Sequence, residues 1–216
     1  MWKIFDNKAG MWTAIFTGFL VLFTFLLYRV ADRQDETARA NERAFLSFSG
    51  PNLGPRFTSS SGEWIGYEIG LNWTNSGNTP AKDAVIQANA QVWPTELPMG
   101  FSYPDSKDSR VNAVVGPKSA YGTLALVSKN DIISTWQGKS RLFFWGEVAY
   151  KDIFPGDPDR LTEFCVELTH LTTNGKELSD PSFALIGFQW QACRTHNCYD
   201  EDCKNYDARV KELRND

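Results

Sequence analysis

The residues best able to do chemistry lie near the C-terminus, where cysteines recur at a fixed interval. Cys193, Cys198 and Cys203 are five residues apart, His196 lies among them, and Cys165 is the only other cysteine. Three thiolates and an imidazole are ligands that zinc accepts in proteins. The spacing matches neither C-x2-C nor a zinc-type histidine pair, so we expect disulfide bonds in an oxidising compartment. Zinc binding and unpaired thiols are the alternatives.

Strand parity favours one disulfide pairing. Apolar residues alternate around Phe164, so Cys165 falls on the other, polar face of that expected strand. Cys193 falls by the same parity on the polar face of the last expected strand. If these two strands are neighbours, a Cys165–Cys193 bond is sterically reasonable, and Cys198 and Cys203 then close a small loop. Four cysteines allow three connectivities, so the other two stay open.

Common catalytic signatures do not occur in the sequence. There are two histidines, His170 and His196, and no G-x-S-x-G, P-loop, G-x-G-x-x-G or H-E-x-x-H motif. Tyr150 and Asp152 share one face of a strand end and could form an acid–base pair, but Asp152 has no histidine neighbour or partner carboxylate in the sequence. We therefore expect no enzymatic activity and no cofactor. We expect the Tyr150 hydroxyl to hold a chain corner through a hydrogen bond.

An uncharged run near the N-terminus has the length of a membrane-spanning helix. Residues 11–28 read MWTAIFTGFLVLFTFLLY and would form a helix of roughly 27 Å, close to the thickness of a bilayer core. Trp12 and Tyr28 lie at its ends, where aromatic belts occur. A cleaved signal peptide and a buried helix of a soluble protein are the alternatives. The run is long for a signal peptide and apolar all round, so we expect an uncleaved anchor after a short tail at residues 1–10.

The next segment, residues 29–43, is charged and contains neither proline nor glycine. Asp35 can pair with Arg39 one helical turn later, and no apolar heptad pattern supports a coiled coil. We expect a helical stalk that holds the following domain away from the bilayer. A regulatory signalling helix would have the same composition.

From residue 44 onward the apolar residues alternate, as they do in β-strands. Lys129–Gln137, with Ser128 as N-cap, is the one clear helix among the strand-like runs, and Asp207–Leu213 could add a helical turn. The eight strand-like runs are Phe45–Ser49, Ile65–Trp73, Ala84–Val92, Val111–Val115, Tyr121–Leu126, Leu142–Tyr150, Leu161–Leu168 and Phe183–Ala192.

This pattern of many short strands with little helix predicts a mainly β fold. We expect an antiparallel, immunoglobulin-like β-sandwich over residues 44–192, in preference to a closed barrel. A charged, cysteine-rich C-terminal tail would then occupy residues 193–216.

Two segments resemble known proteins. Residues 73–81, WTNSGNTPA, look like the N-x-G-x-T-P-A turn of many bacterial immunoglobulin-like envelope domains. Residues 146–154, GEVAYKDIF, followed by TEFC at residues 162–165, resemble a signature of a group of uncharacterised proteobacterial proteins. Those proteins also carry an N-terminal membrane helix, a charged helical stalk and a segment like ERAFL at residues 42–46. The resemblance implies a bacterial single-pass membrane protein with a C-terminal immunoglobulin-like domain, and it implies no activity.

The physical interpretation of the first segment is a turn. Gly77 can adopt a positive φ angle, and Asn75 and Asn78 tolerate left-handed or side-chain-capped conformations. Pro80 would then set an extended start for the next strand. A ligand-binding loop is the alternative. The cysteine-rich end of this chain departs from the group's pattern.

Charge bears on partners and orientation. The net charge of −4 gives no reason to expect nucleic acid as a partner. Two lysines precede the apolar run and four arginines follow it, which favours a cytoplasmic C-terminal domain. The cysteines and the envelope-type resemblance favour the periplasmic side, which we adopt.

Together these features predict a single-pass protein of the bacterial inner membrane. It would display a non-catalytic β-sandwich for protein interaction or envelope assembly, with the lipid bilayer and an unidentified protein as partners. A ligand-sensing domain that signals through the stalk helix is the main alternative, and an undetected hydrolase is a third.

Overall fold

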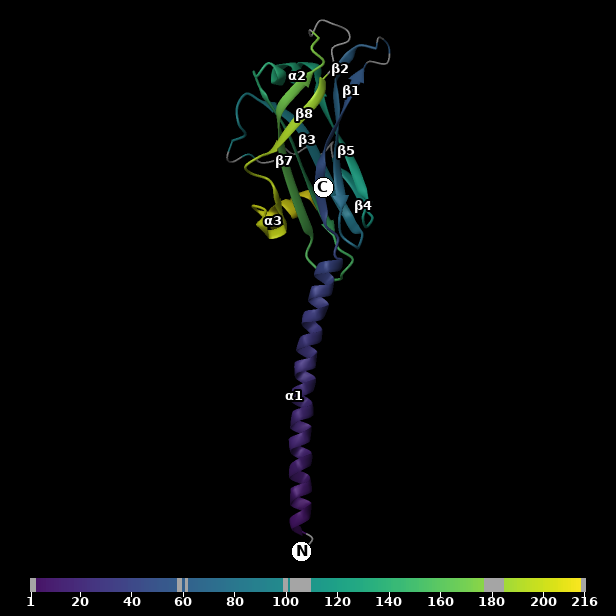
Figure 1. Cartoon of the computed structure of the whole chain (residues 1–216), viewed down its shortest axis with the longest axis vertical. Coiled ribbons are helices and arrows are strands. Elements are labelled where there is room, and N and C mark those ends of the chain that lie inside the picture. The colour runs from purple at the N-terminus through teal and green to yellow at the C-terminus, as the bar shows by residue number, and fades with distance from the viewer. Residues whose placement is uncertain are drawn as a thin grey trace. The chain divides into compact units, whose positions relative to one another are not determined.

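The computed structural model of this chain describes residues 3–57, 60, 62–98, 101, 110–176 and 185–214. The chain divides into two compact units, Met1–Glu42 and Arg43–Asp216. The first unit is helical, and the second is built around two β-sheets (Figure 1). The expected mainly β fold with an N-terminal apolar helix is therefore confirmed.

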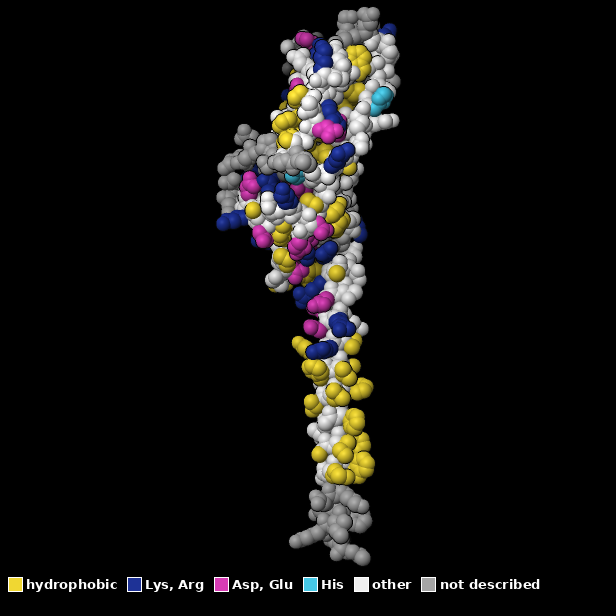
Figure 2. Space-filling model, turned by 90° about the vertical axis from the view of Figure 1, so that its left-hand side faces the viewer, with side chains coloured by type: hydrophobic (Ala, Val, Ile, Leu, Met, Phe, Trp, Pro, Cys, Tyr) yellow, Lys and Arg dark blue, Asp and Glu magenta, His cyan; other side chains and the backbone are white. Residues whose placement is uncertain are grey.

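The N-terminal unit is one continuous helix, α1 (Lys3–Glu42), of 40 residues. It includes the expected anchor and most of the expected stalk without a break, because no proline interrupts the segment. By length and composition, its apolar stretch is able to cross a membrane. Figure 2 shows apolar side chains along that stretch and charged side chains beyond it. Arg39 and Asp35 form the expected ion pair, with 2.9 Å between Nε and Oδ2.

Every strand pairing between described residues of the second unit is antiparallel. The three-stranded sheet has the order β1-β2-β5, with β1 (Leu46–Phe57), β2 (Trp64–Asn75) and β5 (Ala120–Ser128). The six-stranded sheet has the order β4-β3-β6-β7-β8, and β9 pairs with β7. Its strands are β3 (Ala81–Trp93), β4 (Val111–Val115), β6 (Arg141–Lys151), β7 (Arg160–Thr173), β8 (Leu185–Ala192) and β9 (Cys198–Tyr199).

Three short helices occur among the described residues of the second unit. The helix α2 (Lys129–Trp136) begins where the sequence predicts, with the Ser128 hydroxyl accepting from the N–H of Asp131. A 3-10 helix, η2 (Asp200–Asp202), and the helix α3 (Tyr206–Arg214) follow β9 near the C-terminus. Each expected strand overlaps an observed one, although the first two residues of the last expected run lie outside the described residues.

The main core fills the space between the two sheets. Alternation along β2 buries Ile69, Leu71 and Trp73 completely on the inner side. The Phe164 ring stacks on Phe48 from the opposite sheet, with 3.7 Å between ring centroids. Such aromatic contacts add to the stabilisation from burial alone.

The outer face of the six-stranded sheet is also covered, although alternation predicts a polar face there. Segment 193–214, here called the C-terminal segment, packs against this face and buries Leu213 beside Leu161. A second small cluster joins Phe101 to Trp145 and to the fully buried Cys165. The segment is charged in sequence but carries enough apolar side chains to pack, and therefore it belongs to the compact unit.

Candidate functional site

The segments that suggested a known family meet where the second unit begins. The N–H of Ala44 donates to Asp152 Oδ1 (2.7 Å), and the N–H of Leu46 donates to the Tyr150 hydroxyl (3.3 Å). The Thr162 hydroxyl donates to the Leu46 carbonyl (2.8 Å). Burial raises the pKa of Tyr150 to about 12, so its hydroxyl stays protonated. Tyr150 and Asp152 thus hold the first residues of the domain and do not form an exposed acid–base pair.

Asn75 completes this junction from the other sheet. Its fully buried side-chain amide accepts from the N–H groups of Phe45 (3.1 Å) and Gly77 (3.0 Å) and donates to the Thr79 carbonyl (2.8 Å). The expected side-chain-capped turn is therefore present. Pro80 follows it immediately before β3 begins.

The expected positive φ angle at Gly77 is wrong. The described glycines with positive φ are Gly50, Gly62, Gly66, Gly138, Gly156 and Gly175. At Gly77 a Cβ atom would lie 2.1 Å from the Arg43 carbonyl oxygen and 2.7 Å from the Cα of Ala44. Glycine is required there because two backbone segments approach closely, which a local turn pattern cannot reveal.

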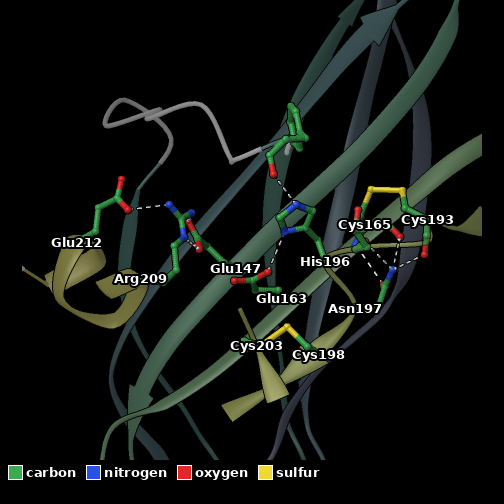
Figure 3. A network of polar contacts seen from close by, with 12 residues as sticks. Glu147, Glu163, Cys165, Cys193, His196, Asn197, Cys198, Cys203, Arg209 and Glu212 are labelled. Carbon is green, nitrogen blue, oxygen red and sulfur yellow. Dashed lines mark hydrogen bonds and ion pairs between the residues drawn. A yellow bond between two sulfur atoms is a disulfide. The ribbon is translucent and has the colours of Figure 1, made fainter. Parts of the chain in front are cut away.

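The most unusual chemistry lies on the outer face of the six-stranded sheet (Figure 3). Glu147 on β6 and Glu163 on β7 are direct cross-strand partners, and both are buried, at 1% and 5% exposure. Two like charges in this position destabilise a sheet unless each carboxylate has a partner. The C-terminal segment supplies both partners.

Arg209 of α3 neutralises Glu147 with two contacts. Its Nη2 lies 2.5 Å from Oε1 and its Nε lies 3.2 Å from Oε2, a bidentate arrangement. A third nitrogen, Nη1, binds Glu212 on the same helix at 2.7 Å. Burial raises the pKa of Glu147 to about 7, while the charge and hydrogen bond of Arg209 oppose that rise.

His196 partners Glu163 in a similar way. Its Nδ1 lies 3.0 Å from Glu163 Oε2, and its Nε2 lies 2.7 Å from the carbonyl oxygen of Phe101. Both neighbours are acceptors, so both ring nitrogens donate when the imidazole is protonated. The hydrogen bond to Glu163 accordingly raises the pKa of His196 against the effect of burial.

All four cysteines form disulfide bonds. Cys165 is joined to Cys193 and Cys198 to Cys203, with Cα–Cα distances of 5.3 and 5.1 Å. This is the pairing that strand parity favours. The side-chain amide of Asn197 donates to the carbonyls of Cys165 (3.1 Å) and Cys193 (3.0 Å), which fixes the chain beside the first bond.

The proposed metal ligands do not converge on one point. Cys193 is bonded to Cys165, and His196 faces Glu163 and a carbonyl. Carboxylate and sulfur atoms of Glu163, Cys198 and Cys203 lie within 4.8 Å of one another, but both sulfurs belong to a disulfide. A disulfide offers no thiolate to a metal ion.

A carboxylate–histidine pair can also serve acid–base catalysis, but neither Glu163 nor His196 lines either of the two hollows described on this domain. The adjacent hollow of about 340 Å³ is lined by residues that include Arg141, Glu167 and Arg194, and by neither Glu163 nor His196. Within it Arg141 is already bound by Glu167 at 2.5 Å and by Glu96 at 3.2 Å. The buried cluster is therefore suited to fastening the C-terminal segment onto the sheet.

A surface of a different kind lies on β5, one of the two edge strands of the three-stranded sheet. Leu124 and Leu126 are 63% and 57% exposed on its outer face, while Ala125 and Val127 between and after them are buried. This leucine edge, Leu124 and Leu126, was not singled out from the sequence. The sequence did contain a signal for it, because β5 is apolar on both faces. In a sandwich of two sheets only one face of a strand packs in the core, so the other apolar face is left exposed.

No protein family, curated protein or solved structure matches this chain. The resemblance to proteobacterial membrane proteins therefore stays a prediction, and the function has to be argued from the geometry.

Proposed function

We propose that this chain is a single-pass membrane protein whose β-sandwich binds other proteins and catalyses no reaction. The leucine edge carries this proposal. Exposed large apolar side chains on an unpaired sheet edge are unfavourable in water and are typical of surfaces that receive a partner. The polar cluster, in contrast, satisfies its own charges and is occupied by the protein itself.

The fold of the binding domain is proposed to be an enlarged immunoglobulin-like sandwich. The arrangement of β1-β2-β5 opposite β4-β3-β6-β7 corresponds to strands A-B-E opposite C′-C-F-G of that fold. On this interpretation β8, β9 and the C-terminal segment are additions that extend and cover the second sheet.

The location is proposed to be the bacterial inner membrane, with the sandwich in the periplasm. Two disulfide bonds support this side, because such bonds persist in oxidising compartments. Rapid alkylation of the protein in intact cells, followed by mass mapping, tests it. Protected cysteines are expected, and four alkylated cysteines would overturn the periplasmic assignment.

Site-specific photocrosslinking tests the binding function. A photoreactive amino acid at position 126 of the full-length protein is expected to give discrete protein adducts in cells. The matched control is position 189, since Gln189 is exposed on β8 in the other sheet. Identical adducts at both positions, or none at position 126, would contradict the proposal.

A further inference from the structure

We propose that the free edge of β5 binds an extended segment of a partner protein as an added β-strand. This inference rests on the proposed binding function and specifies its mode. The partner segment carries apolar side chains at alternate positions, and acidic residues beyond the ends of its apolar stretch.

The direction of the backbone groups in β5 follows from its pairing with β2. The N–H of Asn75 donates to the carbonyl of Ser119 (2.9 Å), and the register continues without a shift through Leu71↔Thr123 and Ile69↔Ala125. In an antiparallel ladder the hydrogen-bonded pairs alternate. Odd-numbered residues of β5 therefore bond to β2, and even-numbered residues point their N–H and C=O groups outward.

The same even-numbered residues hold the exposed side chains. Among the described strands none pairs with this edge, so Leu124 and Leu126 present their backbone groups there and their apolar side chains on the outer face. A strand that pairs with them places every second side chain beside these leucines, as cross-strand pairs require. Gly70, the β2 partner of Leu124, has no side chain of its own beside this leucine.

The opposite edge of the same sheet shows how an edge is made unsuitable for pairing. β1 contains Pro51 and Pro55, and its register with β2 shifts between Phe48 and Pro51. Prolines and bulges are the usual means of preventing strand addition. Strand β5 has no proline, no charged residue and no register shift over its 9 residues.

Charge at the two ends of β5 indicates the chemistry of the partner. Lys118 precedes the strand and Lys129 follows it, whereas no acidic residue lies between them. The Lys118 ammonium donates to the carbonyl of Ser76, and that of Lys129 lies over the Trp64 ring at 5.3 Å from its centroid. Carboxylates flanking the apolar positions of an added strand would complement both lysines.

A second copy of the chain fits this edge less well than a separate segment. Antiparallel pairing of two β5 strands would relate the domains by a two-fold axis perpendicular to the sheet. Such a pair would place Lys118 of one copy near Lys129 of the other at both ends of the paired strands. These like charges would repel, whereas a segment with flanking carboxylates would not.

The experiment uses the full-length protein in lipid nanodiscs and two fluorescent forms of one synthetic peptide, Glu-Gly-Val-Thr-Val-Thr-Val-Gly-Glu. In one form the threonine nitrogens are methylated, and in the other the valine nitrogens are methylated. Only the valine N–H groups face β5 when the valines lie beside the leucines. Fluorescence anisotropy is expected to show the threonine-methylated form binding at least about tenfold more tightly.

Protein variants provide the second arm. Leu124→Lys and Leu126→Lys are each expected to lower the affinity for the threonine-methylated peptide by at least about tenfold. Val114→Lys, a matched change at a 67% exposed valine of β4, is expected to leave binding unchanged. Circular dichroism checks that each variant keeps its fold, and the comparison of the two peptides does not depend on any variant.

Each remaining outcome separates the two proposals. Equal binding of both peptides, or no binding of either, overturns strand addition, while crosslinking at position 126 would still support a binding function. Loss of that crosslinking contradicts the binding function itself. A dimer in light scattering that Leu124→Lys abolishes would replace the partner segment by a second copy.

Discussion

The two faces of the six-stranded sheet are covered by different physical means. The inner face packs against the other sheet through fully buried apolar side chains such as Phe144 and Trp73. The outer face holds two buried glutamates, and the C-terminal segment covers them through ion pairs and disulfide bonds. Apolar burial depends little on pH or redox state, whereas the outer cover depends on both.

The largest loss of stability is expected from a substitution that leaves a cavity on the inner face. Phe144→Ala removes a fully buried ring that lies 4.9 Å, centroid to centroid, from Trp190. The free energy of unfolding in urea should fall by about 4 kcal/mol. A loss below about 1 kcal/mol would mean that this face is not the main core.

Breaking the ion pair on the outer face should lower the free energy of unfolding by a smaller amount. Arg209→Ala leaves Glu147 buried without its cation and should lower the free energy of unfolding at pH 8 by about 3 kcal/mol. Replacing both residues, with Glu147→Leu and Arg209→Met, should recover part of that loss because no buried charge remains. If the double variant is less stable than Arg209→Ala, the ion pair stabilises the fold by more than the removal of an uncompensated buried charge.

The disulfide bonds should follow in magnitude. Cys165→Ala with Cys193→Ala opens a loop of 28 residues and should cost about 2–3 kcal/mol. The matched control, Cys198→Ala with Cys203→Ala, opens a loop of only 5 residues and should cost less. Thermal unfolding of both double variants checks the order, and equal losses would contradict it.

The last prediction concerns pH. The pKa of Glu147 is raised from 4.5 to about 7 and that of His196 is raised above 6.5. A raised pKa means that the folded state holds the proton more tightly, so each group stabilises the domain at low pH and loses this contribution as pH rises through its folded pKa.

The glutamate contribution can be isolated with Glu147→Gln. The stability of this variant relative to the natural protein should rise between about pH 5 and pH 8, since glutamine cannot lose a proton. His196→Asn should show a change of the same sign as the pH rises above 6.5, because the pKa of His196 is raised in the folded state. Parallel pH profiles for variant and natural protein would show that Glu147 keeps an ordinary pKa.

Local patterns in the sequence were sufficient to predict the strands and the start of one helix. Alternation located β2, Ser128 marked the start of α2, and parity placed Cys165 and Cys193 on the polar faces of their strands, where the disulfide bond forms. Each of these signals lies within a few residues of what it predicts, which is why it could be read from one chain.

The missed features depend on residues far apart in the chain. Asp152 binds Ala44 across 108 residues, and Arg209 binds Glu147 across 62. Glu147 and Glu163 each fit the alternation of a strand as outward-facing polar residues. Only the packing of the C-terminal segment turns them into a buried pair, so their spacing alone could not predict the cluster.

The junction at the start of the domain has a mechanical consequence. Ala44 and Leu46 are bonded to residues at the end of β6 and on β7, while Phe45 is bonded to Asn75 at the end of β2. Tension transmitted along the chain through Arg43 is therefore divided between both sheets and loads several hydrogen bonds together. A domain that begins in this way resists being unravelled from its N-terminal end, because no single hydrogen bond carries the whole load.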